Sequence, residues 1–395
     1  MYDVAVIGGG LLGCAVAYHL ARAGTRVVLL EKDELNRHAS GQNAGSLHFQ
    51  LEYRMVADGD AAAERAARAL PLHLDAQRAW AGLAAELDAP VEVVQHGGLM
   101  LAETADELDR LRRKASLERR HGLDVTVLTG AELTSLAPYL AAGVRGAAYA
   151  PGEGKANPRL VTLAYARAAS RLGADLRTGT RVTALTREAG GWRLTTTPTA
   201  AGRGARTDGV RAAAVVLAAG VWTAELAAMA DVRLPVVPVA LSMTATAPTT
   251  PFLPHLVQHV GRRLSMKQTS DGNVLIGGGS PAKFRAVDGR IDLETAPELR
   301  YESLVGNADA ARVVPAVLRL PVLRCWSGAT TLTPDQLPVL GPLPRRPGLY
   351  AATGGSAFTL GPTYARLLAE TLLTGEPSLP IDAYSPARFG FLNAV

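Results

Sequence analysis

Three glycines near the start of the chain have the spacing of a phosphate-binding turn. They form the pattern Gly8-x-Gly10-x-x-Gly13, and the carboxylate of Glu31 follows about 20 residues later. In such a pattern the first glycine permits a tight turn, the second lets a pyrophosphate approach the backbone, and the third lets a helix pack closely on a strand. The carboxylate can accept hydrogen bonds from both hydroxyls of a ribose. The spacing therefore predicts a dinucleotide site without saying which dinucleotide, and a glycine-rich turn without a ligand is the alternative.

The segments around this turn are those that such a site requires. Residues 4–7 are an apolar run typical of a buried strand, residues 11–23 are rich in Ala and Leu, and residues 26–30 predict a second buried strand. The unpaired N–H groups at the start of the intervening helix, together with its dipole, favour the negative charge of a phosphate. The start of the chain therefore predicts a strand, a turn and a helix whose N-terminus faces the ligand.

The remaining pattern predicts a mixed α/β (α+β) fold with interleaved domains. Helical patterns cover residues 61–87, 104–121, 158–173, about 297–311 and 361–374, apolar strands cover 213–220 and 348–355, and alternating antiparallel strands occur between 232 and 320. We expect a Rossmann-like nucleotide-binding domain from residues 1–47, 151–231 and 321–395. An antiparallel-sheet substrate domain, or cap, is expected from residues 48–150 and 232–320.

Composition excludes several classes of protein. The chain is 48% hydrophobic and 19% charged, as expected of a soluble globular protein. Its net charge of +5 is modest and its arginines are scattered among acids, so no nucleic-acid partner is expected. The two cysteines form neither a metal-binding spacing nor a disulfide framework, and we expect no metal site. No signal peptide and no apolar run of about 18 residues is found, so we expect a cytoplasmic protein without a membrane span.

Taken together, several segments resemble the D-amino-acid-oxidase-like family of FAD-dependent oxidoreductases, of the glycine oxidase and sarcosine oxidase type. The resemblance covers nearly the whole chain and is carried by the glycine pattern with Glu31 and by residues 39–45, 218–222, 333–341 and 348–362. Residues 40–48 and 151–158 further resemble the β-type subunits of opine oxidase, hydrogen cyanide synthase and related amino-acid dehydrogenase complexes.

The resemblance implies that the dinucleotide is FAD, bound by several segments of the chain. The glycine turn would hold the pyrophosphate, Val182 the adenine through its backbone, and residues 354–360 the pyrimidine edge of the flavin. The implied FAD-binding residues are Gly8, Gly10, Leu11, Leu12, Gly13, Glu31, Lys32, Ser40, Gly41, Asn43, Ala44, Gly45, Ser46, Val182, Ala219, Gly220, Gly354, Gly355, Ser356, Ala357, Phe358, Thr359 and Leu360.

The activity that the resemblance implies is oxidation of the C–N bond of an amino acid, imino acid or opine, with a hydride passing to flavin N5. Our catalytic candidates are His48, Lys267 and Thr330, and a hydrogen-bonded structural role is an equal alternative for His48. Thr330 stands where the glycine-oxidase pattern has an arginine that binds the substrate carboxylate. The carboxylate anchor is therefore missing from its usual place, and Arg54, Arg263, Lys267 or Lys283 can substitute for it.

The resemblance also bears on partners and on how flavin is attached. A dehydrogenase complex with other subunits is the leading expectation, and a stand-alone oxidase that uses oxygen and a non-catalytic flavin-binding subunit are the alternatives. An NAD-dependent dehydrogenase is disfavoured because such a fold would not need the glycine turn near the C-terminus. FAD is expected to be non-covalent, since Cys325 lies too far before Asp335 for the usual attachment. FMN at a subunit junction would also be non-covalent, because Ala156 takes the place of the attaching histidine.

Overall fold

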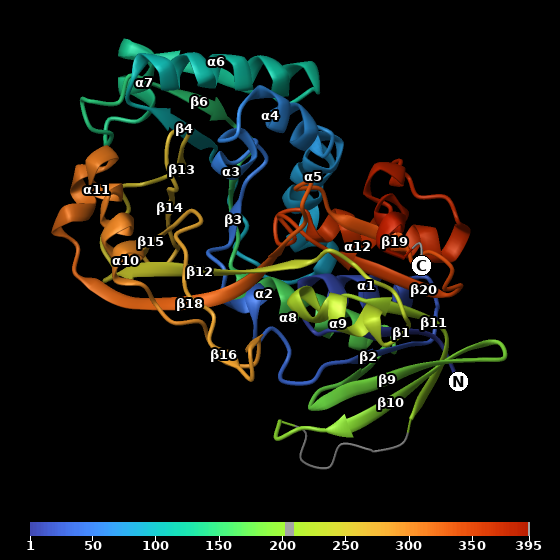
Figure 1. Ribbon diagram of the computed structural model, residues 1–395. Coiled ribbons are helices and arrows are strands. Elements are labelled where there is room, and N and C mark those ends of the chain that lie inside the picture. Colours follow the sequence, from blue (N-terminus) through green and yellow to red (C-terminus); the bar gives the residue numbers. More distant parts are fainter. Residues whose placement is uncertain (202–208, 394–395) are drawn as a thin grey trace.

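The computed structural model describes residues 1–201 and 209–393, and the fold is mixed α/β, built on two eight-stranded sheets (Figure 1). The first sheet has the order β19-β20-β11-β1-β2-β8, and a further hairpin of β9 and β10 pairs with β11. Its strands are β1 (Tyr2–Ile7), β2 (Val27–Leu30), β8 (Asp175–Arg177), β9 (Thr180–Glu188), β10 (Gly191–Pro198), β11 (Val210–Leu217), β19 (Val339–Pro342) and β20 (Leu349–Thr353). The five strands from β20 to β8 are parallel, so their carboxyl ends meet at one edge.

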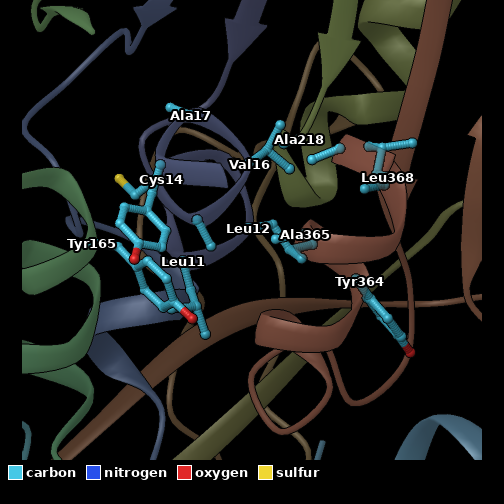
Figure 2. Close-up of a cluster of buried hydrophobic side chains, with 14 of the residues drawn as sticks. Leu11, Leu12, Cys14, Val16, Ala17, Tyr165, Ala218, Tyr364, Ala365 and Leu368 are labelled. Carbon is cyan, nitrogen blue, oxygen red and sulfur yellow. The ribbon is translucent and has the colours of Figure 1, made fainter. Parts of the chain in front are cut away.

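Three helices cover one face of this sheet, and burial on both faces explains why its central strands are apolar throughout. They are α1 (Leu11–Arg22), α8 (Pro158–Arg171) and α12 (Gly361–Thr374), and their side chains join one buried cluster (Figure 2). Leu11 and Val16 of α1 meet Tyr165 of α8 and Tyr364 of α12 in this cluster. A parallel strand between two covered faces needs apolar side chains on both sides, which is the composition of residues 4–7.

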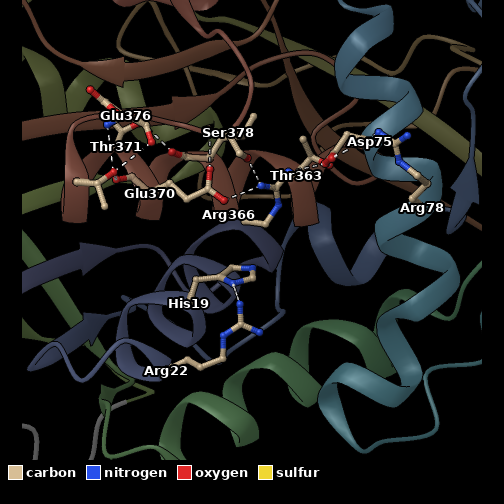
Figure 3. A network of polar contacts seen from close by, with 12 residues as sticks. His19, Arg22, Asp75, Arg78, Thr363, Arg366, Glu370, Thr371, Glu376 and Ser378 are labelled. Atoms are coloured by element: carbon tan, nitrogen blue, oxygen red, sulfur yellow. Dashed lines mark hydrogen bonds and ion pairs between the residues drawn. The ribbon is translucent and has the colours of Figure 1, made fainter. Parts of the chain in front are cut away.

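Polar contacts tie α12 to α5 (Leu70–Leu87) at the edge of this layer (Figure 3). The guanidinium of Arg366 lies 2.9 Å from Asp75 Oδ2 and 2.6 Å from Glu370 Oε1, and the hydroxyl of Thr363 donates to the same Asp75 oxygen. Segments nearly 300 residues apart in sequence are therefore joined by a partly buried ion pair.

The second sheet has the order β18-β12-β15-β14-β13-β4-β6-β5 and is antiparallel except where β13 pairs with β4. Its strands are β4 (Gly98–Ala102), β5 (Thr126–Thr129), β6 (Gly146–Ala150), β12 (Val237–Thr246), β13 (Leu256–His259), β14 (Ser265–Gln268), β15 (Val274–Gly277) and β18 (Val322–Leu332). The helices α6 (Ala105–Arg120) and α7 (Gly130–Leu136) lie at its far end, and the long strands β12 and β18 extend toward the first sheet (Figure 1).

Shorter elements connect the two sheets. They are α2 (Ala39–Gln42), β3 (Ser46–Leu47), α3 (Tyr53–Val56), α4 (Asp60–Ala67), β7 (Gly154–Lys155), α9 (Thr223–Ala228), β16 (Ala286–Val287), β17 (Arg290–Ile291), α10 (Tyr301–Ala308) and α11 (Ala310–Val313). Short 3₁₀ helices cover Gly220–Trp222, Pro315–Arg319, Asp382–Tyr384 and, with a kink at Phe389, Pro386–Asn393. No helix within residues 1–201 and 209–393 is long and apolar enough to cross a membrane.

Most predicted segments match the structure, and two predicted helices are each divided in two. The helix expected over residues 61–87 is α4 followed by α5, and Pro71 lies in the first turn of α5, where a missing N–H costs nothing. The helix expected near 297–311 is α10 followed by α11. The capping box of Thr104 and Glu107 is present at the start of α6.

The division into two domains remains a prediction, and strand pairing adds one observation about it. Residues 322–332, which we expected in the nucleotide-binding domain, pair with β12 and so belong to the second sheet. The Gly, Arg and Thr between Pro198 and Arg211 predict a hairpin loop, and its residues 202–208 lie outside the described part of the chain.

Candidate cofactor and substrate site

The glycine turn lies where β1 meets α1, and the structure explains each of its three glycines. Gly8 has φ +117°, and a Cβ on it would lie 2.5 Å from the carbonyl oxygen of Ala218. A Cβ on Gly13 would lie 1.8 Å from the carbonyl oxygen of Gly8. A Cβ on Gly10 would lie 2.8 Å from Ser40 Oγ, directly in front of the N-terminus of α1. The first and third glycines let strand and helix touch, and the second keeps the space before the helix open.

Glu31, at the end of β2, is held beside this turn by backbone hydrogen bonds. Its Oε2 accepts from the N–H of Gly9 at 2.6 Å, and its Oε1 accepts from the N–H of Asp33 at 2.8 Å. The side chain is buried, so the carboxylate is a fixed acceptor at the carboxyl edge of the sheet. The backbone of Glu31 also receives the N–H of Thr180, which places β9 and Val182 on the same side of the molecule.

The segment from Ser40 to Ser46 passes directly in front of α1. Ser40 Oγ accepts from the N–H of Leu11 at 2.9 Å, and a Cβ on Gly41 would lie 2.1 Å from the carbonyl oxygen of Asn36. Asn43 closes the turn, because its amide nitrogen donates to Ser40 O and its oxygen accepts from the N–H of Gly45. The backbone of this segment is therefore held near the helix N-terminus by its own side chains.

Other expected cofactor residues follow the same edge of the sheet. Ala219 and Gly220 come directly after β11, and Lys32 Nζ lies 3.8 Å from the centre of the Trp222 ring and 2.6 Å from Glu294 Oε2. Glu31, Asp33 and His38 also lie close enough to share a cation, and each oxygen of Glu31 accepts one backbone N–H, which leaves it further acceptor capacity.

The predicted flavin loop, residues 354–360, lies between β20 and α12 and contacts the start of the chain. Thr359 Oγ1 donates to the carbonyl oxygen of Ser46 at 3.3 Å and accepts from the N–H of His48 at 3.4 Å. The indole N–H of Trp80 donates to Thr359 O at 2.6 Å, and its ring packs on Phe358. Both segments therefore meet at one place, although they are more than 300 residues apart.

A charged cluster that the sequence analysis largely missed lies against this loop. Arg54 donates to Glu52 Oε1 at 2.9 Å and to Ser356 Oγ at 2.8 Å, and it also donates to Gln336. Burial raises the pKa of the Glu52 carboxyl, but Arg54, His48 and the Ser356 hydrogen bond outweigh burial and lower it to about 2. Arg54 already has a carboxylate partner, which makes it a weaker candidate for binding a substrate carboxylate. Nothing in the spacing of Glu52 and Arg54 marked them as a pair in advance.

One face of the second sheet turns toward residues 42–48. Strand pairing places Trp326, Thr330, Ser265 and Lys267 on this same face, because directly paired residues share a face. The indole N–H of Trp326 donates to Gln42 O at 2.8 Å, and Ser265 Oγ lies 3.3 Å from His48 Nε2. We call this surface the inner face.

The inner face is partly accessible, whereas the opposite side of the same strands is buried. The half-buried members include Leu241, Met243, Leu275 and Thr330, and their neighbours in sequence on the opposite face, such as Ser242 and Ile276, are buried. A cavity of about 530 Å³ opens beside it between α2 and β18. Its lining includes Gln42, Glu298, Arg324, Trp326 and Ser327.

Lys267 and His48 both lie at the end of this face nearest residues 42–48, where His48 contacts Ser265 on the same strand as Lys267. A Cβ on Gly45 would lie 3.0 Å from Lys267 Nζ, which donates to the carbonyl oxygen of Ala156 at 3.3 Å. Burial, and then the charge of Lys155, lowers the pKa of Lys267 to about 7. Burial also lowers the pKa of His48, whose Nδ1 is buried and has no hydrogen-bond partner in the described residues. Thr330 shares the inner face, but β12 and β15 separate its strand from β14.

These features fit FAD. The open helix N-terminus suits a pyrophosphate and the fixed carboxylate of Glu31 suits a ribose. Three buried polar atoms near this edge, Ser46 Oγ, His48 Nδ1 and Trp222 Nε1, have no partner within the described parts of the chain. Buried polar groups are nearly always hydrogen-bonded, so these atoms favour a polar ligand along this edge.

Comparisons with known proteins agree with this geometry. The model of the DAO family, described as FAD dependent oxidoreductase, matches residues 3–371. The chain is 31% identical to glycine oxidase from Geobacillus kaustophilus, over 98% of this chain and 97% of that protein. It is 26% identical to sarcosine oxidase subunit beta from Rhizobium meliloti, over 99% of this chain and 89% of that protein. The crystal structure of glycine oxidase from Geobacillus kaustophilus superposes with a TM-score of 0.82 at 30% identity, covering 98% of both chains.

Replacing Gly10 with Val tests the cofactor turn. We expect the folded Gly10→Val protein to lose FAD, because branches on Cβ would fill the space between Ser40 Oγ and the helix N-terminus. The measurement is the ratio of flavin absorbance to protein after gel filtration. Gly82→Ala is the control, since Gly82 is an exposed residue of the helix α5 with an ordinary φ and no atom near its Cβ position. Stoichiometric flavin in the Gly10→Val protein would contradict the assignment.

Proposed function

The chain belongs to the DAO family of FAD-dependent oxidoreductases, and on this premise we propose that it oxidises the C–N bond of an amino acid, imino acid or opine as the catalytic β-type subunit of a dehydrogenase. The observation that carries the proposal is that Lys267 lies beside Gly45, while His48 contacts Ser265, which shares a strand and a face with Lys267. Lys267 lies next to the segment that fits the cofactor, His48 follows that segment in the chain, and Leu241, Met243 and Leu275 on the same inner face are half-buried.

Lys267 supplies the positive charge that Thr330 does not. In the described residues no carboxylate lies within ion-pair distance of Nζ, and the Ala156 carbonyl accepts only one of its hydrogens. A buried ammonium without a counter-ion is costly, and a substrate carboxylate would remove that cost. We assign the carboxylate anchor to Lys267, with the Thr330 hydroxyl able to add only one hydrogen bond.

His48 is the group that orients the amine. Its low pKa keeps the ring neutral near pH 7, and a neutral imidazole has one nitrogen that can accept a hydrogen bond from a substrate N–H. The half-buried Leu241, Met243 and Leu275 provide an apolar surface for the carbon skeleton. Bound FAD supplies the acceptor for the hydride that leaves the carbon next to nitrogen.

The relatives support two hypotheses about which acceptor takes the electrons from the reduced flavin. The likeness to sarcosine oxidase subunit beta supports a subunit of a complex, and the likeness to glycine oxidase supports a stand-alone oxidase. We favour the complex because residues 40–48 and 151–158 resemble dehydrogenase β-type subunits. An FMN at a subunit junction is part of this proposal, and it would be non-covalent because Ala156 is buried and offers no nucleophile. A non-catalytic flavin-binding subunit is the remaining alternative.

The first experiment is an anaerobic screen of amino acids, imino acids and opines for bleaching of the flavin. We expect at least one class to bleach it, and artificial dyes to accept the electrons much faster than oxygen does. Absence of bleaching by any amine would support the non-catalytic subunit. Rapid peroxide release by the isolated chain, without gain from a co-expressed partner, would support the stand-alone oxidase.

A second prediction concerns the charge on Lys267. A simple carboxylate such as acetate should bind the oxidised enzyme with constant affinity below about pH 7 and about tenfold more weakly per pH unit above it, because Lys267 loses its proton there. Lys267→Met should weaken binding roughly 10- to 100-fold and remove this pH dependence. Flavin difference spectra give the dissociation constants. Arg119→Met, which removes an exposed cation of α6, is the control, and an unchanged affinity in Lys267→Met would assign the anchor elsewhere.

A third prediction is that FAD is held without a covalent bond. Cys325 alternates with Trp326 along β18, so its side chain lies on the face away from residues 42–48, with Sγ 3.6 Å from Thr244 Oγ1. Acid precipitation should therefore release all the flavin colour into the supernatant. Colour that stays with the pellet would refute this.

A further inference from the structure

A buried chain of polar side chains holds residues 49–51, next to the proposed site. Glu153 Oε1 accepts the N–H groups of Phe49 and Gln50, both at 2.8 Å, and Glu118 Oε1 accepts the N–H of Leu51 at 2.7 Å. The side chains of Glu153 and Glu118 are fully buried. Three consecutive backbone donors are thus bound by carboxylates and not by a neighbouring strand.

The order of donors and acceptors in this chain is fixed. Lys114 Nζ donates to Gln50 Oε1 at 3.1 Å and to Glu118, and Gln50 Nε2 donates to Glu153 Oε2 at 3.0 Å. The ammonium of Lys114 can only donate, so Gln50 Oε1 must face Lys114 and the amide nitrogen of Gln50 must face Glu153. Gly98 leaves the room for this, since a Cβ there would lie 2.0 Å from Glu153 Oε2.

The segment held in this way connects the two halves of the proposed site. His48 precedes it and contacts Thr359 and Ser265, and the pair of Glu52 and Arg54 follows it and contacts Ser356. Glu153 is itself anchored, because the following strand β7 pairs with β3 at Ser46 and Leu47. A shift of residues 49–51 would therefore move His48 and Arg54 together.

The network is too costly to be explained as core packing alone. One cation, Lys114, faces two buried carboxylates, and burial raises the pKa of Glu153 to about 7 although the hydrogen bonds from Gln50 lower it. Apolar residues of the same volume often stabilise a core as well as a buried charged network does. A network of this kind is retained where it fixes one geometry.

We propose that Glu153 is a positioning residue, which acts through Gln50 and the backbone of residues 49–51 to hold His48 and Arg54 at the edge of the bound flavin. The inference rests on the proposed function for its consequence in catalysis. Its structural part is the placement of residues beside the flavin, and this placement can be tested without measuring turnover.

The test exchanges the two partners of the central hydrogen bond. Glu153→Gln puts an NH₂ group against the amide donor of Gln50, and Gln50→Glu puts a second carboxylate against Glu153. The double variant restores the order, because the carboxylate at position 50 accepts from Lys114 and from the amide at position 153. The new amide oxygen at position 153 still accepts the two backbone N–H groups.

We expect each single variant to retain stoichiometric FAD, to change the visible circular dichroism of the flavin, and to bind a simple amine such as methylamine at least tenfold more weakly, because His48 orients the amine. The double variant should recover the spectrum and come within about threefold of the original affinity. Asn307→Asp is the matched control, since Asn307 belongs to a buried polar cluster with Ser280 and Thr244 that does not touch residues 48–54. It should lower the thermal midpoint without changing the flavin spectrum.

Single variants with the original spectrum and affinity would overturn the proposal. So would a double variant that recovers thermal stability but neither spectrum nor affinity, because Glu153 would then be structural only. If Gln50→Glu does not fold, Gln50→Met is used instead, because it removes the bridging amide. A changed flavin spectrum and a weaker ligand affinity in Gln50→Met would support the proposal, and an unchanged spectrum and affinity would overturn it. If no amine bleaches the original enzyme, the proposed function fails while the circular dichroism still tests the positioning.

Discussion

The contact between β1 and α1 is the constraint on which the site depends. A Cβ on Gly13 would lie 1.8 Å from the carbonyl oxygen of Gly8, so strand and helix touch through their backbones. This contact points the N-terminus of α1 at the carboxyl edge of the sheet, where Glu31, Ser40 and the end of β11 also lie. The N-terminus of a helix held at this edge of the sheet is suited to a phosphate.

A second constraint is the burial of charged side chains in and beside the second sheet. Lys267 is buried with a carbonyl oxygen as its hydrogen-bond partner, whereas Lys114, also buried, has Glu118 and Gln50. The two lysines are similarly buried but have different roles. A buried ammonium whose charge and hydrogen bonds are satisfied by the protein holds the surrounding structure in one geometry. A buried ammonium without a counter-ion can bind an anionic ligand.

These two constraints meet at residues 45–54. This short stretch pairs with β7, contacts the loop after β20 and faces the inner side of the second sheet. It has little regular structure of its own, so side chains from distant segments satisfy its backbone groups. Side-chain hydrogen bonds can therefore hold such a stretch in one position although most of it is neither helix nor strand.

The sequence by itself determined the cofactor half of the molecule. The glycine spacing, the apolar strands and the carboxylate of Glu31 predicted the strand, turn and helix that the structure contains, because their causes are local: backbone freedom, periodicity and helix capping. The sequence also marked Lys267 and His48 as candidates, but it could not bring them together. Tertiary structure alone decided that Lys267 lies beside Gly45, that Arg54 is paired with Glu52, and that Glu153 and Glu118 bind the backbone of residues 49–51. All of these contacts except the pair of Arg54 and Glu52 join segments that are far apart in the chain, and no periodic pattern in the sequence predicts any of them. Whether a buried charge has a partner also depends on how both sheets pack.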